Sequence, residues 1–265
     1  MRKNKIKAIV TLSFDDCYQD TLVNVLPLLK KYKLKASFNV AVGLINKKLD
    51  GLKLADWADL HEANKFGAEI CSHSITHTSL VDNNKLQKFI RSFPYRHNKL
   101  RFIFEGIKDT FSPQKMGHLS NVLVENEVGQ SKDLLDQRGF QVSSFVYPNG
   151  YYNHKLKLLV KKYYSSARST DAGFNNLSHL NLYALKIFPW DRWTKIATAN
   201  QWVNKAIKQK LWLIESFHLV AAANKNNYRY FTSTEDFEKH LQYLQTKNIP
   251  VVPQNEVIEF LKKEL

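Results

Sequence analysis

The stretch Ser13-Phe14-Asp15-Asp16 ends the first apolar run of the chain, and His73-Ser74-Ile75-Thr76-His77 follows a later one. Two adjacent carboxylates and a His-x-x-x-His pair supply three ligands for a metal ion and one spare carboxylate. A metal hydrolase needs such a set, because its ligands must leave a position for water and a base must lie beside it. Either motif alone is weak, since an Asp-Asp pair is more often a turn or a helix cap.

Both motifs stand where strands are expected to end. Lys7–Phe14 is a short β-branched, apolar run, and Gly67–Ser72 also has the character of a strand. The carboxyl ends of parallel strands converge on one face of an α/β barrel, where such enzymes keep their active sites. We therefore expect the carboxylates and the histidines to meet at that face.

Strands alternate with helical stretches along the chain, without repeats or low-complexity linkers. This alternation predicts a parallel sheet closed into a barrel, and 265 residues are a common length for one α/β barrel domain. The expected strands are Ala8–Phe14, Lys35–Val40, Ala68–Ser72, Val142–Tyr147, Ser165–Arg168, Ala184–Phe188, Leu211–Phe217 and Val251–Val252. The expected helices are Thr21–Lys33, Leu54–Phe66, Glu125–Arg138, His154–Tyr163, Thr198–Gln209, Thr234–Thr246 and Asn255–Lys263.

The sequence resembles the polysaccharide deacetylases, the NodB-homology domains of carbohydrate esterase family four, over almost its whole length. The first family motif, Thr/Ser-Phe-Asp-Asp-Gly, appears as Ser13 to Cys17, and the second, His-Ser/Thr-x-x-His, as His73 to His77. Phe145–Gly150 is similar to the Phe-x-x-Pro-x-Gly element, and Ile214–His218 to the late strand that ends in a catalytic histidine. Phe231–Phe237 and the following helix match the C-terminal run of the family. The resemblance implies a distorted α/β barrel of about seven strands in a single domain.

The resemblance implies that Asp16, His73 and His77 hold one divalent metal ion, most often zinc, with cobalt, manganese and nickel as alternatives. It also implies that Asp15 is the general base acting on water and that His218 protonates the leaving amine. Each has a structural alternative, because Asp15 could merely orient a ligand and His218 could be a core residue.

Further site residues follow from the same resemblance. The backbone N–H after the motif proline stabilises the oxyanion in the family, and here it belongs to Asn149, which could instead serve only a turn. Substrate contacts are expected from Tyr147, Pro148 and Trp190, and Asp191 is expected to tune His218.

Two positions depart from the family pattern. Many members carry an arginine two residues before the motif proline, where it orients the catalytic aspartate, but this chain has Val146. We expect Lys186 or Arg192 to supply the missing charge. Cys17 replaces the motif glycine, and we expect Cys17 and Cys71 to be free thiols, with a pairing between them as the alternative.

Composition bounds the partners and the location. The formal net charge is +15, and most lysines fall on expected helices, where they form solvated faces or attract an anionic polymer such as a cell-wall glycan. Recognition motifs for nucleic acid are missing, so no nucleic-acid partner is expected. No apolar run approaches the roughly eighteen residues of a transmembrane segment. The basic N-terminus has no signal peptide, which leaves the cytoplasm and export after signal removal both open.

A long segment at about 81–124 separates the second motif from the next family-like helix. Typical relatives cross here with a shorter link, and this segment is rich in aromatic and basic residues. Such an insertion beside a catalytic face is either a substrate-binding lid, which we favour, or a packing and oligomer element.

The expected activity is metal-dependent removal of N-linked acetyl groups from an N-acetylated amino-sugar polymer or oligomer, chitin-like or peptidoglycan-like. Two alternatives stay open: a hydrolase of the same fold that acts on another small amide, and a non-catalytic glycan-binding protein. The intact set of Asp15, Asp16, His73, His77 and His218 argues against the second alternative.

Overall fold

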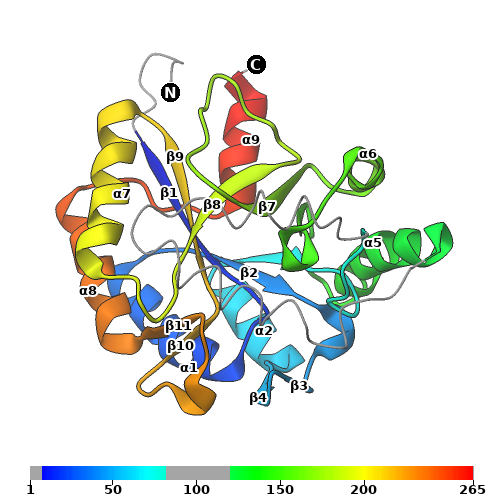
Figure 1. Cartoon of the computed structure of the whole chain (residues 1–265), viewed down its shortest axis with the longest axis horizontal. Coiled ribbons are helices and arrows are strands. Elements are labelled where there is room, and N and C mark those ends of the chain that lie inside the picture. The colour runs from blue at the N-terminus through cyan, green and yellow to red at the C-terminus, as the bar shows by residue number, and fades with distance from the viewer. Residues whose placement is uncertain (1–7, 82–119, 265) are drawn as a thin grey trace, which may run out of the picture.

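A closed barrel of seven parallel strands forms the centre of the molecule (Figure 1). The computed structural model describes residues 8–81 and 120–264. The strands follow one another around the barrel as β1 (Ile9–Phe14), β2 (Ser37–Val40), β5 (Glu69–Ser72), β6 (Ser144–Val146), β7 (Ser166–Ala172), β8 (Leu185–Pro189) and β9 (Trp212–Phe217). β9 pairs with β1 and closes the ring. The expected single α/β barrel domain is thus confirmed.

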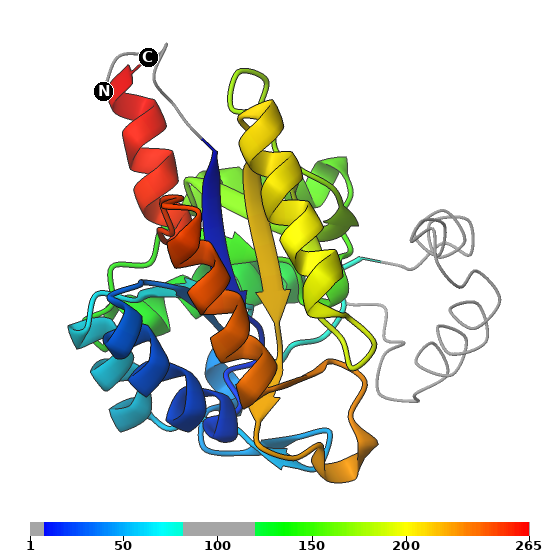
Figure 2. The same ribbon diagram turned by 90° about the vertical axis from the view of Figure 1, so that its left-hand side faces the viewer.

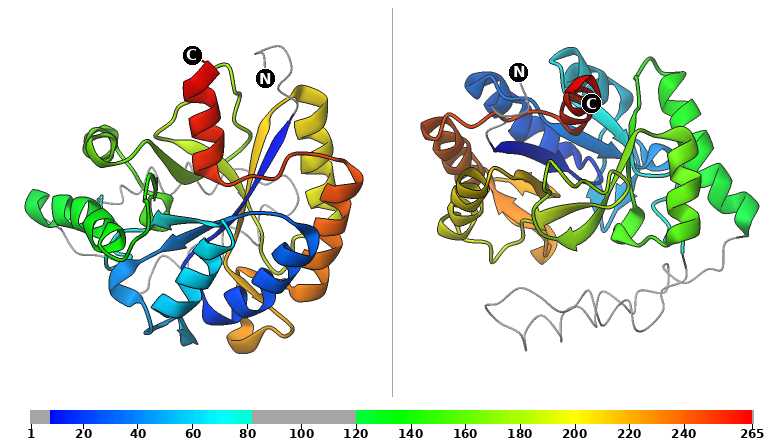
Figure 3. Two further views of the ribbon diagram at one scale, coloured as in Figure 1. Left: turned by 180° about the vertical axis from the view of Figure 1, so that it is seen from behind. Right: turned by 90° about the horizontal axis from the view of Figure 1, so that it is seen from above.

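Helices surround the barrel. They are α1 (Gln19–Tyr32), α2 (Trp57–Lys65), α5 (Asn121–Asp136), α6 (His154–Tyr163), α7 (Ile196–Gln209), α8 (Thr234–Thr246) and α9 (Gln254–Glu264). Figure 1 and the left view of Figure 3 place α7 and α8 on one side of the barrel and α5 and α6 on the other. Among the described helices, none combines the length and the apolarity needed to cross a membrane.

Burial on both faces explains why β1 was readily predicted. Every residue of β1 is buried, because the barrel interior lies on one side and the helices lie on the other. Phe14 stacks on Phe38 of β2 and Phe217 of β9, with ring centroids 5.0 and 5.3 Å apart, and meets Phe237 of α8 edge-on. Figure 2 shows β1 and β9 side by side.

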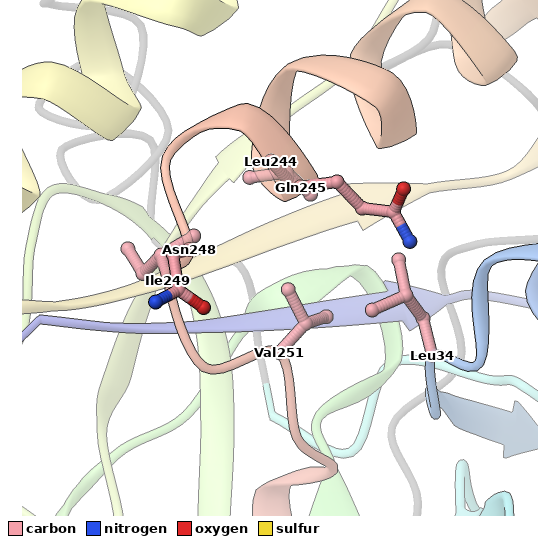
Figure 4. A pocket seen from close by; sticks show the side chains of 6 residues that line it. All are labelled: Leu34, Leu244, Gln245, Asn248, Ile249 and Val251. Atoms are coloured by element: carbon pink, nitrogen blue, oxygen red, sulfur yellow. The ribbon is translucent and has the colours of Figure 1, made fainter.

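The amino-terminal end of the barrel is closed by α9. Val257 and Ile258 pack with Ile9, Trp212 and Ile214. A pocket of about 380 Å³ lies near this end, lined by Leu34, Leu244, Gln245, Asn248, Ile249 and Val251 (Figure 4). Leu34 precedes β2, and Val251 forms a bridge with Val10 near the start of β1, so this pocket lies away from the carboxyl ends of the strands.

The remaining differences from the sequence prediction are local. Val251–Val252 is not a strand, since Val251 forms only an isolated bridge. Four short strands were not expected: β3 (Lys48–Leu49) and β4 (Leu52–Lys53), which form a hairpin, and β10 (Leu219–Ala221) and β11 (Phe231–Ser233), which pair in parallel. α5 begins at Asn121 rather than Glu125. Most of the predicted insertion, residues 82–119, lies outside the described residues.

Both cysteines are free, as expected, and both are buried. The Cys17 Sγ donates to the Asn39 carbonyl oxygen at 3.4 Å. Burial raises the pKa of both thiols well above the usual value, which keeps them protonated and unreactive at neutral pH.

Candidate metal and catalytic site

Asp16, His73 and His77 come together at the carboxyl ends of β1 and β5. One ligand atom from each lies within 4.8 Å of the other two. The Asp16 Oδ1 is 3.3 Å from the His77 Nε2 and 3.8 Å from the His73 Nε2. Asp16 and His73 are buried, whereas the His77 side chain is 16% exposed and borders the solvent. The geometry therefore joins the two sequence motifs into one cluster.

The state of His73 fits a metal ligand. Its Nδ1 lies 2.8 Å from the Val146 carbonyl oxygen. Because a carbonyl oxygen only accepts, Nδ1 carries the proton and the Nε2 lone pair faces Asp16. Burial, and then the neighbouring His77, lower the pKa of His73 to about 4, so the imidazole is neutral at neutral pH. Two imidazoles and one carboxylate form a common catalytic set for a divalent ion, and a carbonyl partner behind a ligating histidine is typical of such sites.

The backbone at this cluster takes an uncommon conformation. Asp16 and His77 have positive φ angles of 63° and 60°. Ser74, which lies in the loop His73–His77 (the histidine loop), has a φ of 67°. Such angles are costly for residues other than glycine and persist where surrounding contacts enforce them. The two loops are therefore strained at the residues that carry the candidate ligands.

The histidine loop is held from one side by the short 3₁₀ helix η2 (Val42–Leu44). The Val42 N–H donates to the Ser74 carbonyl oxygen at 3.1 Å, and the Gly43 N–H donates to the Ile75 carbonyl oxygen at 2.9 Å. A Cβ on Gly43 would lie 2.8 Å from that same oxygen, which explains the absence of a side chain here.

Asp15 follows β1 and points into a set of side-chain donors. Its Oδ1 accepts from the Asn39 Nδ2 at 2.6 Å and from the Arg168 guanidinium. Its Oδ2 accepts from the Ser216 Oγ at 2.9 Å. The Arg168 Nε also donates to the Ser13 Oγ at 3.2 Å. Asp15 is buried, and these contacts fix both of its oxygens.

Arg168 is a candidate site residue that was not predicted from the sequence. It lies on β7, where it pairs with Val146 of β6 in the parallel register. The family pattern places an arginine at the position of Val146, so here the positive charge contacts Asp15 from the neighbouring strand. Arg192 instead binds Asn227, and the Lys186 side chain is exposed. Burial lowers the pKa of Arg168 to about 9, which still leaves it charged at neutral pH. The sequence feature that could have identified Arg168 is its charge at the end of the expected strand Ser165–Arg168.

His218 follows β9 and borders Asp15. Its Nε2 is 3.7 Å from the Asp15 Oδ2, and its ring stacks on Tyr230 at 4.6 Å between centroids. The buried Nδ1 has no hydrogen-bond partner within residues 8–81 and 120–264. Burial, and then the charge of Arg168, lower the pKa of His218 well below its usual value. The ring is therefore neutral at rest.

The other predicted residues occupy different surroundings. Asn149 lies in the 3₁₀ turn η4 (Pro148–Gly150), just after the Val146 carbonyl that contacts His73, and has a φ of 57°. Pro148 is buried, and so is Tyr147, whose hydroxyl donates to the Tyr183 carbonyl oxygen at 3.1 Å. The turn Pro148–Gly150 therefore lies close to the site, whereas the Tyr147 ring packs in the core.

Trp190 and Asp191 make contacts within the protein. The Trp190 Nε1 donates to Glu215 at 3.2 Å, and Glu215 also lies 2.7 Å from the His240 Nε2; all three side chains are buried. The Asp191 Oδ1 accepts from the Trp193 N–H and the Thr194 hydroxyl at 3.0 and 2.9 Å. Substrate contact by Trp190 and tuning of His218 by Asp191 stay predictions.

A family model for polysaccharide deacetylases matches residues 2–166. The chain belongs to this family. The match contains both carboxylates and both histidines of the cluster, whereas Arg168 and His218 lie beyond its end. No curated protein sequence matches this member of the family.

Solved structures with the same fold include known deacetylases. The family member is 14% identical to a T48 deacetylase solved with substrate; 96% of this chain and 92% of that one are covered, with a TM-score of 0.54. It is 15% identical to a family 4 acetyl xylan esterase from Clostridium thermocellum in complex with a cobalt ion, at 95% and 91% coverage and a TM-score of 0.55. A family 4 pseudoenzyme mutant with restored activity is 13% identical, at 95% and 68% coverage and a TM-score of 0.54. At these identities the likeness shows the fold.

Proposed function

We propose that the protein is a metal-dependent carbohydrate N-deacetylase that hydrolyses the acetamido group of an N-acetylated amino sugar in a polymer or oligomer. The observation that carries this proposal is the convergence of two groups at one end of the barrel. Asp16, His73 and His77 have ligand atoms within 4.8 Å of one another, and Asp15 lies beside His218 at 3.7 Å. Zinc is the metal we propose, because two imidazoles and a carboxylate suit it.

Asp15 acts as the general base. A divalent ion held by Asp16, His73 and His77 would polarise the acetyl carbonyl and lower the pKa of a bound water. The Asp15 Oδ1 already accepts from Asn39 and from a charged guanidinium, while Oδ2 accepts from the Ser216 hydroxyl. Oδ2 is therefore the more basic oxygen, and it takes the proton of the attacking water.

His218 delivers a proton to the leaving amine. Because burial and Arg168 lower its pKa, the neutral ring must gain that proton during the reaction. The Asp15 Oδ2 lies 3.7 Å from the His218 Nε2, so the proton taken from water has a short path to the imidazole. Expelling an amine requires such a donor, and general acid–base catalysis contributes typically about 10²–10⁴ in rate. The Asn149 N–H, in the turn beside the site, is proposed to stabilise the oxyanion.

The substrate class follows from the same groups. An amide nitrogen leaves only when protonated, whereas an ester oxygen leaves more easily, so a site with a dedicated donor is suited to amides. The net charge of +15 favours an anionic polymer such as peptidoglycan over a neutral one such as chitin, through long-range attraction. A glycan-binding protein without catalysis would have no need for the Asp15 and His218 pair.

The test combines metal content with acetate release. Protein purified without chelator should contain close to one zinc or cobalt ion per chain, and it should release acetate from chitin oligomers or peptidoglycan faster than from acetylated xylan. His77→Ala should lose both the metal and the activity. His218→Ala should keep the metal and lose about 10²-fold or more in rate on the amide substrates. Absence of bound metal after reloading, or undiminished amide cleavage by His218→Ala, would contradict the proposal.

A further inference from the structure

Glu127 is a second residue that holds the histidine loop, in addition to η2. This residue lies on α5 and is only 9% exposed. Its Oε2 accepts from the Ile75 N–H at 2.8 Å and from the Thr76 N–H at 3.0 Å, and its Oε1 accepts from the Thr76 hydroxyl at 2.8 Å. One buried carboxylate thus satisfies three donors of the two residues that precede His77.

The same face of α5 also contacts the strand before His73. Ser131 lies four residues after Glu127, one helical turn away, and such pairs share a helix face. The Ser72 Oγ donates to the Ser131 Oγ at 2.8 Å. α5 therefore contacts the chain immediately before each of the two histidines.

Several backbone groups of the loop are hydrogen-bonded. η2 supplies donors to the Ser74 and Ile75 carbonyls, the Ser74 hydroxyl accepts from the His77 N–H at 3.2 Å, and Glu127 accepts from the Ile75 and Thr76 N–H groups. Positive φ angles at Ser74 and His77 show that the loop is strained. A strained loop keeps its shape only if its surroundings fix it, and the Glu127 contacts involve a charged acceptor, which makes them the strongest of these.

We propose that Glu127 is a positioning residue for the metal site, which presets the histidine loop so that His77 faces Asp16 and His73 before any ion binds. This inference rests on the proposed metal-dependent function for its purpose, but the hydrogen bonds of Glu127 join protein groups only and can be tested separately. Loss of the carboxylate removes the acceptor of two part-buried N–H groups and allows His77 to leave the ligand geometry. Residues that orient ligands in this way typically change metal affinity by about 10- to 100-fold when they are replaced.

The experiment compares Glu127→Ala and Glu127→Gln with wild type and with Glu125→Ala as a matched control. Glu125 lies on the same helix and is 51% exposed. Its Oε1 accepts from the Tyr163 hydroxyl at 3.3 Å and forms an ion pair with the Lys162 Nζ at 3.9 Å. Two quantities are measured: hydrogen exchange of the Ile75 and Thr76 amides in metal-free protein, and the zinc dissociation constant by titration. Thermal unfolding of the metal-free proteins checks that each variant is folded.

Glu127→Ala should exchange both amides faster than wild type and bind zinc about 10- to 100-fold more weakly. Glu127→Gln keeps one carbonyl oxygen for the two N–H groups and should recover most of the affinity, while Glu125→Ala should match wild type. Wild-type exchange and affinity in a folded Glu127→Ala would overturn the proposal. Should that variant not fold, Glu127→Asp, which keeps the charge but is too short for all three contacts, serves in its place with the same criteria.

A wild-type protein that binds no zinc would reject the proposed function. In that case the exchange measurement still tests whether Glu127 fixes the histidine loop. Faster exchange of Ile75 and Thr76 in the alanine variant supports it, and unchanged exchange rejects it.

Discussion

Asp15 accepts hydrogen bonds from three side chains that belong to three different strands: Asn39 on β2, Arg168 on β7 and Ser216 on β9. Only Arg168 carries a charge. The carboxylate is therefore fixed in orientation and its charge is balanced by Arg168, which is the preorganisation that the proposed general base needs.

Replacing Arg168 by alanine should weaken both stability and catalysis. The variant leaves a buried carboxylate without its cation, which typically costs about 3–5 kcal/mol, and we expect the rate to fall about 10²-fold or more. Urea unfolding and acetate release measure the two effects. Arg192→Ala is the control, because Arg192 binds Asn227 instead.

A transplant tests whether the strand of origin matters. Val146 is the register neighbour of Arg168, and adjacent strands lie about 4.8 Å apart. The double variant Val146→Arg, Arg168→Val should therefore regain part of the stability and rate that Arg168→Val alone loses. A double variant no better than Arg168→Val would show that the guanidinium acts only from β7.

At the scale of residues, the sequence predicts those site residues that stand in short local motifs. Asp15, Asp16, His73 and His77 stand in short motifs at strand ends, and the structure brings them together. The positive charge beside Asp15 was expected from Lys186 or Arg192, because the sequence does not show which residues on neighbouring strands share a register. That information arises only when the barrel closes.

At the scale of elements, both η2 and α5 form hydrogen bonds with the histidine loop. The contact with η2 depends on the close approach of Gly43 to Ile75, whose carbonyl oxygen and Cγ2 would both lie 2.8 Å from an added Cβ. A side chain can move away from such a contact, but the backbone oxygen accepts from the Gly43 N–H and cannot move without losing that bond.

Gly43→Ala should consequently destabilise the protein by about 1–3 kcal/mol, the usual range for overpacking, and weaken zinc binding through displacement of His77. Denaturant unfolding and metal titration measure these changes. Adding Ile75→Ala removes the Cγ2 contact but keeps the carbonyl oxygen. Full rescue by that second change would contradict the backbone origin of the effect.

The barrel strands were predicted and the short strands outside the barrel were not, for a physical reason. Every residue of β1, β2, β5, β6 and β9 is buried, which favours recognisable strand patterns in the sequence, and α1 presents a regular apolar face to the barrel. β10 and β11 have three residues each and pair where Leu219, Ala221 and Phe231 pack with Tyr18. Tertiary contacts rather than local pattern define such strands.

At the scale of the whole molecule, a polar network ties α9 into the barrel. The Glu69 Oε2 accepts from the Ser37 hydroxyl at 2.7 Å and from the Asn255 N–H at 3.1 Å. The Gln254 Nε2 donates to the Ser166 hydroxyl at 2.9 Å. Burial raises the pKa of Glu69 above its ordinary value of 4.5 despite these hydrogen bonds.

The raised pKa predicts a pH dependence of stability. Between the ordinary value and the raised value the folded chain binds more protons than the unfolded chain, so this group's contribution to stability is lost as pH rises through that window. Glu69→Gln removes the titration. The unfolding free energy of the variant relative to wild type should therefore increase as the pH rises from 4.5 through the raised pKa of Glu69. A constant difference across that range would contradict the assignment.

The pairing of β1 with β9 runs the full length of the strand, from Ile9 beside Trp212 to Phe14 beside Phe217. During synthesis, β1 cannot pair with β9 until most of the chain has left the ribosome. Asp16, His73 and His77 emerge early, whereas Arg168, Ser216 and His218 emerge late. A nascent chain thus contains the proposed metal ligands well before the residues that hold Asp15 and the proposed proton donor. Under the proposed mechanism, the growing polypeptide can bind an ion in outline long before it can hydrolyse a substrate.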